Sequence, residues 1–181
     1  MMNPSDARSS KPRMRARRPL AFVATLIGLL AIAASAVALD AGARAPEIGL
    51  ADLQGNQVTM ASLRGRVVVV DFMASWCEPC ADSMPVYQRL YTEHQARGLT
   101  VVAVSQDRSA DNARQFAQRH HLTFPVVFDG AHAVANRYQP PRMPTAYVID
   151  RQGIVRHVHQ GYRAADAAAL EREVVALLGA R

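Results

Sequence analysis

The sequence predicts an α/β fold, a central mixed β-sheet flanked by helices, in a domain that spans residues 45–181. Three observations lead to this prediction. The stretch "GRVVVVDFMA" is a continuous β-branched run, typical of a strand buried on both faces of a parallel sheet. Strand-like and helix-like segments alternate after it, as they do in proteins with parallel strands. Near the end, "TAYVID", "RQG" and "IVRHVHQG" indicate a hairpin, which adds antiparallel strands at one end of the sheet.

The first half of the domain contains a hairpin, the buried run and a long helix. The segment "LADLQGNQVTM" predicts the hairpin, with its turn at Gly55-Asn56. The long helix is expected from Cys77 to about Arg97, because apolar side chains recur at a spacing of four and Gly98 fits a C-terminal cap. Pro85 falls inside this helix and is expected to kink it.

The second half continues the alternation. "LTVVAVS" predicts a second buried strand, followed by a helix that Ser109 caps, and "FPVVFD" predicts a third strand. A short helix is expected over residues 131–138 and a closing helix from Ala164 to Leu178. The apolar residues on one side of the closing helix are Leu170, Val174, Leu177 and Leu178.

Residues 1–39 differ in character from the rest of the chain. A basic stretch is followed by twenty uncharged residues, Leu20 to Leu39, which can cross a bilayer as a helix. The positive charge before this run keeps the N-terminus in the cytoplasm, so that the domain is periplasmic or otherwise extracytoplasmic and anchored in the inner membrane. The alternative is a cleaved signal peptide, because the small residues Ala34, Ala36 and Ala38 fit a cleavage site. We interpret residues 1–19 as a cytoplasmic basic tail, 20–39 as a transmembrane anchor or signal peptide, and 40–44 as a linker.

The formal net charge of +6 is concentrated at the N-terminus. Residues 1–39 carry six Lys or Arg and one acid, whereas the remainder carries fifteen Arg and fourteen acids. The nearly balanced domain offers no basic patch of the kind that nucleic-acid binding requires. We therefore exclude nucleic acid as a partner.

The chain contains two cysteines, Cys77 and Cys80, separated by Glu78 and Pro79. A domain of this length can bury a core without disulfide staples, so the pair is not needed as scaffolding. Cys77 begins the predicted helix, where unpaired backbone N–H groups and the positive helix end stabilise a thiolate, and Pro79 fits the first turn. Cys80 lies one turn further, close enough to attack a mixed disulfide at Cys77. The spacing therefore predicts disulfide exchange with Cys77 as the exposed nucleophile.

Two other interpretations of the pair are a zinc site and an inert structural bridge. A zinc site needs further ligands, and the chain has no second cysteine pair. A bridge that closes so short a ring constrains the unfolded chain little. We expect redox chemistry that uses no metal ion and no cofactor.

Asp71 is the next unusual residue, because it places a carboxylate inside a strand that otherwise suits a dry core. Burial is expected to raise the pKa of its carboxyl group toward neutrality. Since Asp71 precedes Cys77 by six residues, it could accept the proton of Cys80 as a general base when that thiol attacks. The alternative is a carboxylate that is hydrogen-bonded at a sheet edge.

Three segments, "VVVVDFMASWCEPC", "MPTAYVID" and "APEIGLADLQGNQVTMASLRG", resemble the TlpA/ResA-like branch of the thioredoxin superfamily. The resemblance covers residues from about 45 to 178. It implies a thioredoxin fold with an N-terminal hairpin and an inserted helix-strand unit, which the segment count puts at about residues 110–128. It also implies site roles: Cys77 as nucleophile, Cys80 as resolving thiol, Asp71 as buried acid, Pro144 as a cis-proline facing the disulfide, Met143 as a backbone contact for a substrate strand, and Trp76 as an apolar rim.

The sequence departs from this family pattern at two places. Many members carry a glutamate where this chain has Ser83, which puts a proton route through that position in doubt. The loop "QPPRMPT" is rich in proline and carries Arg142 at its tip, which could change which partners dock.

Glu78 bears on the direction of electron flow. A negative charge beside Cys77 raises the pKa of the thiol, so we expect a reductant of protein disulfides rather than a strong oxidant. The alternative is that Glu78 only complements the helix dipole. In an oxidising compartment such a reductant must be recharged. The resemblance implies a membrane electron donor and substrates such as oxidised apocytochrome c, as in cytochrome c maturation.

Three rival functions remain to be weighed. A peroxiredoxin-like peroxidase shares the fold, but its catalytic cysteine follows a threonine where this chain has Ala74. A copper-delivery protein could use the cysteine pair and a histidine as soft ligands. No histidine, however, is spaced from the pair in a way that indicates a metal site. A non-catalytic membrane-anchored adaptor would have no need of the intact Cys-X-X-Cys and Asp71.

Overall fold

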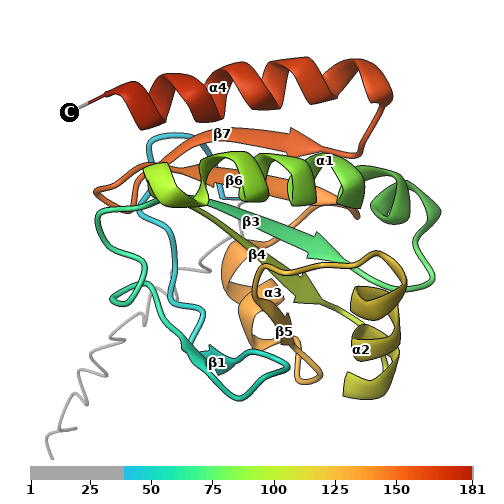
Figure 1. Ribbon diagram of the computed structural model, residues 1–181. Coiled ribbons are helices and arrows are strands. Elements are labelled where there is room, and N and C mark those ends of the chain that lie inside the picture. The colour runs from blue at the N-terminus through green and yellow to red at the C-terminus, as the bar shows by residue number, and fades with distance from the viewer. Residues whose placement is uncertain (1–38, 181) are drawn as a thin grey trace, which may run out of the picture. The chain divides into compact units, whose positions relative to one another are not determined.

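The computed structural model describes residues 39–180, and the structural statements below concern that part of the chain (Figure 1). Its centre is a five-stranded sheet with the strand order β5-β4-β3-β6-β7. β3 pairs in parallel with β4 and antiparallel with β6, which confirms the predicted mixed sheet. The strands of this sheet are β3 (Val67–Met73), β4 (Leu99–Ser105), β5 (Val126–Phe128), β6 (Thr145–Ile149) and β7 (Val155–Gln160).

β3 occupies the middle of the sheet because its β-branched side chains can pack on both faces. All seven of its residues are buried. Successive side chains of a strand point to opposite faces, so Asp71 faces the same way as Val69 and Met73, while Val70 and Phe72 face the other way. The carboxyl group of Asp71 is thereby directed into one of the two apolar layers.

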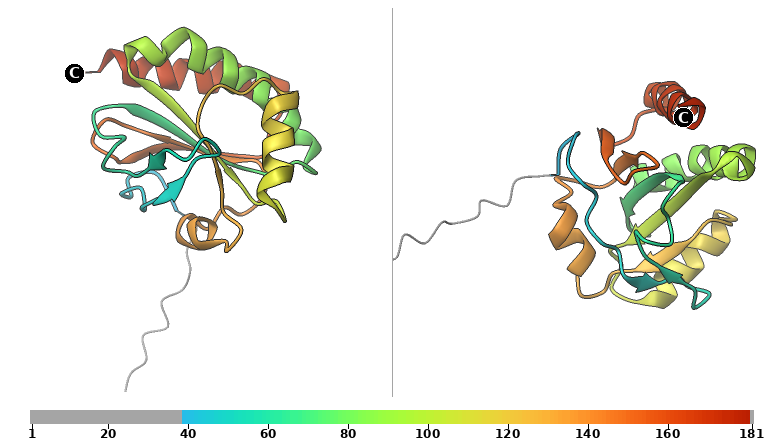
Figure 2. Two further views of the ribbon diagram at one scale, coloured as in Figure 1. Left: turned by 60° about the horizontal axis from the view of Figure 1, so that its bottom comes forward. Right: turned by 90° about the vertical axis from the view of Figure 1, so that its left-hand side faces the viewer.

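Helices cover both faces of the sheet (Figure 2). Three of them pack on the face that carries Asp71, and the fourth packs with the N-terminal segment on the opposite face. The first three are α1 (Glu78–His94), α2 (Ala110–Arg119) and α4 (Ala167–Gly179), and the fourth is α3 (Ala133–Tyr138). A short 3₁₀ helix, η2 (Ala164–Asp166), leads into α4. Together η2 and α4 match the predicted closing helix.

The N-terminal hairpin consists of β1 (Leu50–Ala51) and β2 (Gln57–Val58), and its prediction is confirmed. Gly55 adopts a φ of 92° in the turn, a conformation that favours glycine. The backbone N–H of Leu53 donates to the carbonyl of Val126 at 2.9 Å, so the hairpin lies against β5. The predicted inserted unit is α2 followed by β5, which supplies an edge strand of the sheet.

The long helix α1 also matches its prediction closely. It continues through Pro85, which therefore does not end it. A 3₁₀ turn, η1 (Gln95–Arg97), follows, and Gly98 adopts the left-handed conformation that closes it. The predicted cap of α2 is present as well, because the Ser109 side chain accepts a hydrogen bond from the backbone N–H of Asn112 at 3.3 Å.

The structure differs from the prediction at the segment expected to be a linker. The N–H of Gly42 donates to the carbonyl of Val155, and the N–H of Val155 donates to the carbonyl of Ala43. Residues 40–44 are thus hydrogen-bonded to the β6–β7 hairpin, because their backbone groups pair with β7. The predicted tail at residues 1–19 and most of the predicted anchor or signal peptide lie outside the described residues. Between residues 39 and 180, no helix has the length and apolar character needed to cross a membrane.

The packing of α4 on the sheet predicts a contrast between two adjacent valines. Val174 is fully buried, whereas Val175 is 37% exposed. Val174→Ala should lower the free energy of unfolding by about 1.5–3 kcal/mol through lost burial and a cavity. The matched change Val175→Ala should cost less than about 0.5 kcal/mol. Urea denaturation of the oxidised proteins measures both, and equal losses would contradict this packing.

Candidate active site

The two cysteines lie at the start of α1, directly after the turn that follows β3. They form a disulfide, with 2.06 Å between the sulfur atoms and 5.3 Å between the Cα atoms. Cys77 is the N-cap residue of α1 and is 7% exposed, whereas Cys80 is fully buried. Cys77, which was expected to be exposed, is therefore largely covered, and it supplies the small exposed surface of the pair.

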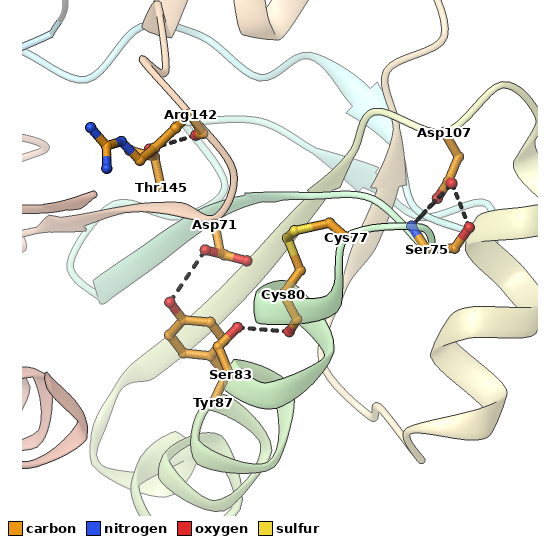
Figure 3. Close-up of a disulfide and its surroundings, with 9 residues drawn as sticks. All are labelled: Asp71, Ser75, Cys77, Cys80, Ser83, Tyr87, Asp107, Arg142 and Thr145. Carbon is orange, nitrogen blue, oxygen red and sulfur yellow. Dashed lines mark hydrogen bonds between the residues drawn. A yellow bond between two sulfur atoms is a disulfide. The ribbon is translucent and has the colours of Figure 1, made fainter. Parts of the chain in front are cut away.

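A carboxylate that the sequence analysis did not identify holds the loop in front of Cys77. Asp107 is buried and accepts hydrogen bonds from the backbone N–H and the hydroxyl of Ser75, the latter at 2.7 Å (Figure 3). The hydroxyl of Ser105 also donates to Asp107, at 2.8 Å. The N–H of Cys77 donates to the carbonyl of Ala74. These bonds fix the entry of the chain into α1, and no sequence spacing links Ser75 to an acid that lies two residues after the end of β4.

The peptide bond between Met143 and Pro144 is cis, as the family resemblance implies. The Thr145 hydroxyl donates to the carbonyl of Arg142 at 2.7 Å and ties the two ends of this turn together (Figure 3). Pro144 is buried, and Met143 is partly buried against the same apolar layer as the cysteines.

Two hollows flank the start of α1. One has a volume of about 710 Å³ and is lined by polar groups and by Trp76, whose side chain is 66% exposed. The other has a volume of about 470 Å³ and lies between Pro79 and Met143, with Arg142 and Tyr162 in its wall. Trp76, the residue expected to form an apolar rim, is exposed, and so are Glu78 and Pro79 between the two cysteines.

Asp71 lies in the sheet beneath this pair, and it is fully buried. Its strand is central, so the alternative of a carboxylate at a sheet edge is wrong. The Tyr87 hydroxyl donates a hydrogen bond to Oδ1 of Asp71 at 3.2 Å, while Oδ2 is buried without a hydrogen-bond partner. Burial raises the pKa of Asp71 well above its ordinary value, and the hydrogen bond from Tyr87 offsets part of this rise. The predicted burial and pKa shift are confirmed.

Tyr87 is the second site residue that the sequence analysis does not identify. The spacing of four along the helix marks Tyr87 only as one of the side chains that face the core. Burial, followed by the nearby Asp71 carboxyl, raises the pKa of its phenol well above the ordinary value, so the group remains a donor. Ser83 occupies the position at which many family members carry a glutamate. Its hydroxyl donates a hydrogen bond to the carbonyl of Cys80 at 2.8 Å. Ser83 therefore supports the first turn of α1 through that carbonyl.

Within the described part of the chain, no three His, Cys, Asp or Glu side chains are grouped so that they could hold a metal ion. The site instead consists of a disulfide, a buried carboxyl group and a phenol, and these groups can exchange electrons through sulfur and hold a proton.

Comparison with known proteins assigns the family. The model of the AhpC/TSA family matches residues 41–158. The chain belongs to the AhpC/TSA family. It is 36% identical over 124 residues to the thiol-disulfide oxidoreductase ResA of Geobacillus thermodenitrificans, a match that covers 68% of this chain and 71% of that protein. It is 34% identical to the thioredoxin-like protein YneN of Bacillus subtilis, over 69% of this chain and 74% of that one.

A solved structure agrees with this AhpC/TSA assignment. A candidate thiol:disulfide interchange protein DsbE from Chlorobium tepidum is similar with a TM-score of 0.75 and 38% identity, over 78% of this chain and all of that one. The resemblance noted from the sequence and the thioredoxin fold are thus both confirmed.

The buried acid of this AhpC/TSA protein predicts a pH-dependent stability difference. The pKa of Asp71 is raised by folding, so ionisation destabilises the folded state, and this penalty grows as the pH rises from about 4 toward the folded pKa. Asp71→Asn cannot ionise. The free energy of unfolding of Asp71→Asn, taken relative to that of the wild type, should therefore increase as the pH rises, by at most about 1.4 kcal/mol per pH unit.

Denaturation of the oxidised proteins across pH measures this difference. The matched control is Asp82→Asn, which changes an exposed acid on α1. Parallel pH curves for the wild type and Asp71→Asn would contradict the raised pKa.

Proposed function

We propose that this chain is an extracytoplasmic thiol-disulfide oxidoreductase that reduces protein disulfides through a cycle of Cys77 and Cys80. The observation that carries the proposal is the unequal exposure of the two cysteines at the start of α1, with the fully buried Cys80 on the side of Asp71. Relatives named as thiol-disulfide oxidoreductases support the reaction class. The direction of electron flow, the compartment and the substrate are the finer parts of the proposal.

The first half of the cycle uses the accessible sulfur. In the reduced protein, the Cys77 thiolate attacks one sulfur of a substrate disulfide. A new sulfur–sulfur bond forms between Cys77 and the substrate, the substrate disulfide breaks, and the departing substrate thiolate takes a proton from water. The N-terminus of α1 stabilises the attacking thiolate, because the positive end of the helix dipole is directed at it.

The second half uses the buried sulfur. Cys80 gives its proton to the carboxylate of Asp71 and attacks Sγ of Cys77 as a thiolate. The bond between Cys77 and the substrate breaks, the Cys77–Cys80 disulfide forms, and the second substrate thiolate leaves. Two electrons have then passed from the protein to the substrate. The proton on Asp71 must leave before the next turnover.

The exposed Glu78, the first residue of α1, supports reduction as the direction. Its negative charge adjoins Cys77 and disfavours the thiolate, which makes the dithiol a better electron donor. We place the domain outside the cytoplasm, held by Leu20–Leu39 in the inner membrane if that run is not cleaved. There a membrane electron donor would restore the dithiol, and oxidised apocytochrome c is one suitable substrate.

No site observation favours the rival enzyme, a peroxidase. Ala74 lies at the position where a threonine would be required, and its methyl group offers no hydrogen bond to a peroxide. The side chain of Cys80 is fully buried and bonded to Cys77 within one turn, which suits release of a mixed disulfide.

Trapping tests the cycle directly. Cys80→Ser should retain the first attack and lose the release, so it should accumulate a mixed disulfide between Cys77 and a natural substrate. Mass spectrometry of the extracytoplasmic fraction identifies that substrate. The matched variant Cys77→Ser should trap nothing and lose at least about a thousandfold in rate. Equal trapping by both variants, or by neither, would contradict the assigned roles.

Equilibrium titration against a thiol buffer tests the direction. We expect a midpoint near that of thioredoxin, roughly −270 mV, rather than near the roughly −120 mV of a strong oxidant. Glu78→Gln should move the midpoint to a less negative value by up to about 30 mV, because it removes the charge that disfavours the thiolate. A wild-type midpoint near the oxidant value would overturn the reductase assignment.

A further inference from the structure

The hydrogen bond between Tyr87 and Asp71 joins two buried groups. The reaction cycle above gives a role to Asp71 and none to Tyr87. Both side chains lie in the apolar layer between the sheet and α1. Asp71 has one hydrogen-bonded oxygen and one oxygen without a partner. We propose that Tyr87 is a positioning residue, which holds Oδ1 of Asp71 so that Oδ2 is free to take the proton of Cys80 and then release it. This inference rests on the proposed function.

The geometry of α1 brings these groups to one face. Cys80, Ser83 and Tyr87 are spaced by three and four residues, so they follow one another along the side of the helix that faces the sheet. All three are buried. Figure 3 shows the phenol of Tyr87 below Asp71, with the second carboxyl oxygen turned to the side of the disulfide. One carboxyl group therefore lies between a fixed donor and the sulfur that must lose a proton.

The neighbouring strands leave room for this arrangement and bring no competing group. The residues paired with Asp71 are Ala103 on β4 and Ala146 on β6, and neither side chain can donate a hydrogen bond. Tyr87 is thus the donor that the described residues supply to this carboxyl group. The hydroxyl of Ser83 donates to the carbonyl of Cys80 and also lies beside the phenol of Tyr87, whose pKa it lowers.

Other titratable groups face this layer from the elements around it. On β7, His159 lies beside Ala146, and its Nε2 is 2.6 Å from Glu173 of α4, so the two form their own pair. After β7, Tyr162 is close enough to raise the pKa of Tyr87. On α1 the other phenol packed against this layer is that of Tyr91, and the two thiols of the reduced protein lie at the start of the helix. None of these groups takes the place of Tyr87 at Oδ1.

The hydrogen bond has a defined effect on the reaction. Burial alone favours the protonated carboxyl group, and the hydrogen bond from Tyr87 lowers the pKa of Asp71 toward the range in which it can act as a base. Removal of the hydroxyl leaves the ring and its packing, but it raises that pKa further. A larger fraction of Asp71 is then protonated at neutral pH, and fewer molecules can accept the proton of Cys80.

A single-turnover reaction isolates the step. The reduced protein is mixed with dithiobis(nitrobenzoate), an aromatic disulfide that releases a coloured thiolate. Cys77 releases one thiolate as it forms the mixed disulfide, and attack by Cys80 releases the second, so the second phase reports the step assisted by Asp71. The proteins compared across pH are the wild type, Tyr87→Phe and the matched control Tyr91→Phe, which alters a tyrosine one turn further along α1.

For Tyr87→Phe we expect the pH midpoint of the second phase to rise by about one unit, with about a tenfold loss of rate below the midpoint and little loss above it. Tyr91→Phe should stay within about twofold of the wild type at every pH. In an Asp71→Asn background, Tyr87→Phe should change the rate by less than about twofold, because the group on which it acts is absent. A tyrosine fluorinated beside its hydroxyl, placed at position 87, is a stronger donor and should lower the midpoint.

Two results would overturn the inference. One is a uniform loss of rate in Tyr87→Phe with an unchanged midpoint, which indicates a structural role. The other is an equal loss in the Asp71→Asn background. If Tyr87→Phe does not fold, an unchanged or raised midpoint in the fluorinated protein overturns the inference in its place. Failure of the proposed function gives a different result, because the wild type itself would then release no second thiolate.

Discussion

The carboxyl group of Asp71 lies in an apolar layer of the protein, and its environment determines how the rest of the site works. The group is fully buried, which raises its pKa, and the one hydrogen bond that it receives offsets part of that rise. Burial of an isolated charge is costly, so a protein that needed only a packed sheet would have an apolar residue at this position. The carboxyl group is instead retained on the side of the sheet on which the buried sulfur of Cys80 lies.

The fold brings sulfur and proton chemistry to the same place. The central strand β3 carries Asp71, and the turn after it delivers Cys77 to the N-terminus of α1. The same helix then returns Cys80 and Tyr87 over the strand, so that both cysteines and the proposed proton acceptor come from one strand-turn-helix segment. Asp107 fixes the turn before α1. The cis peptide bond at Pro144 directly precedes β6, the strand that pairs with β3.

Most of the fold and half of the site could be predicted from the sequence. The β-branched run, the Gly-Asn turn and the Cys-X-X-Cys motif are local signals, and each appears where it was expected. Contacts made through space left no such signal: the bond of Ser75 to Asp107 depends on the register of β3 against β4, and that of Tyr87 to Asp71 depends on how α1 is rotated over the sheet. Residues 40–44 carried a linker-like composition, yet their backbone pairs with β7. Composition does not reveal pairing with a distant strand.

Titration of the Asp71 carboxyl group by NMR, with its carboxyl carbon isotope-labelled in the oxidised protein, tests the central claim most directly. The claim is that burial keeps this group protonated well above the pH at which an ordinary aspartate ionises. We expect a single transition with a midpoint well above about 4, the value of an exposed aspartate. A midpoint at about 4 would contradict the claim, since an ordinary carboxylate on this strand could not serve as the proton acceptor for Cys80 in the way described.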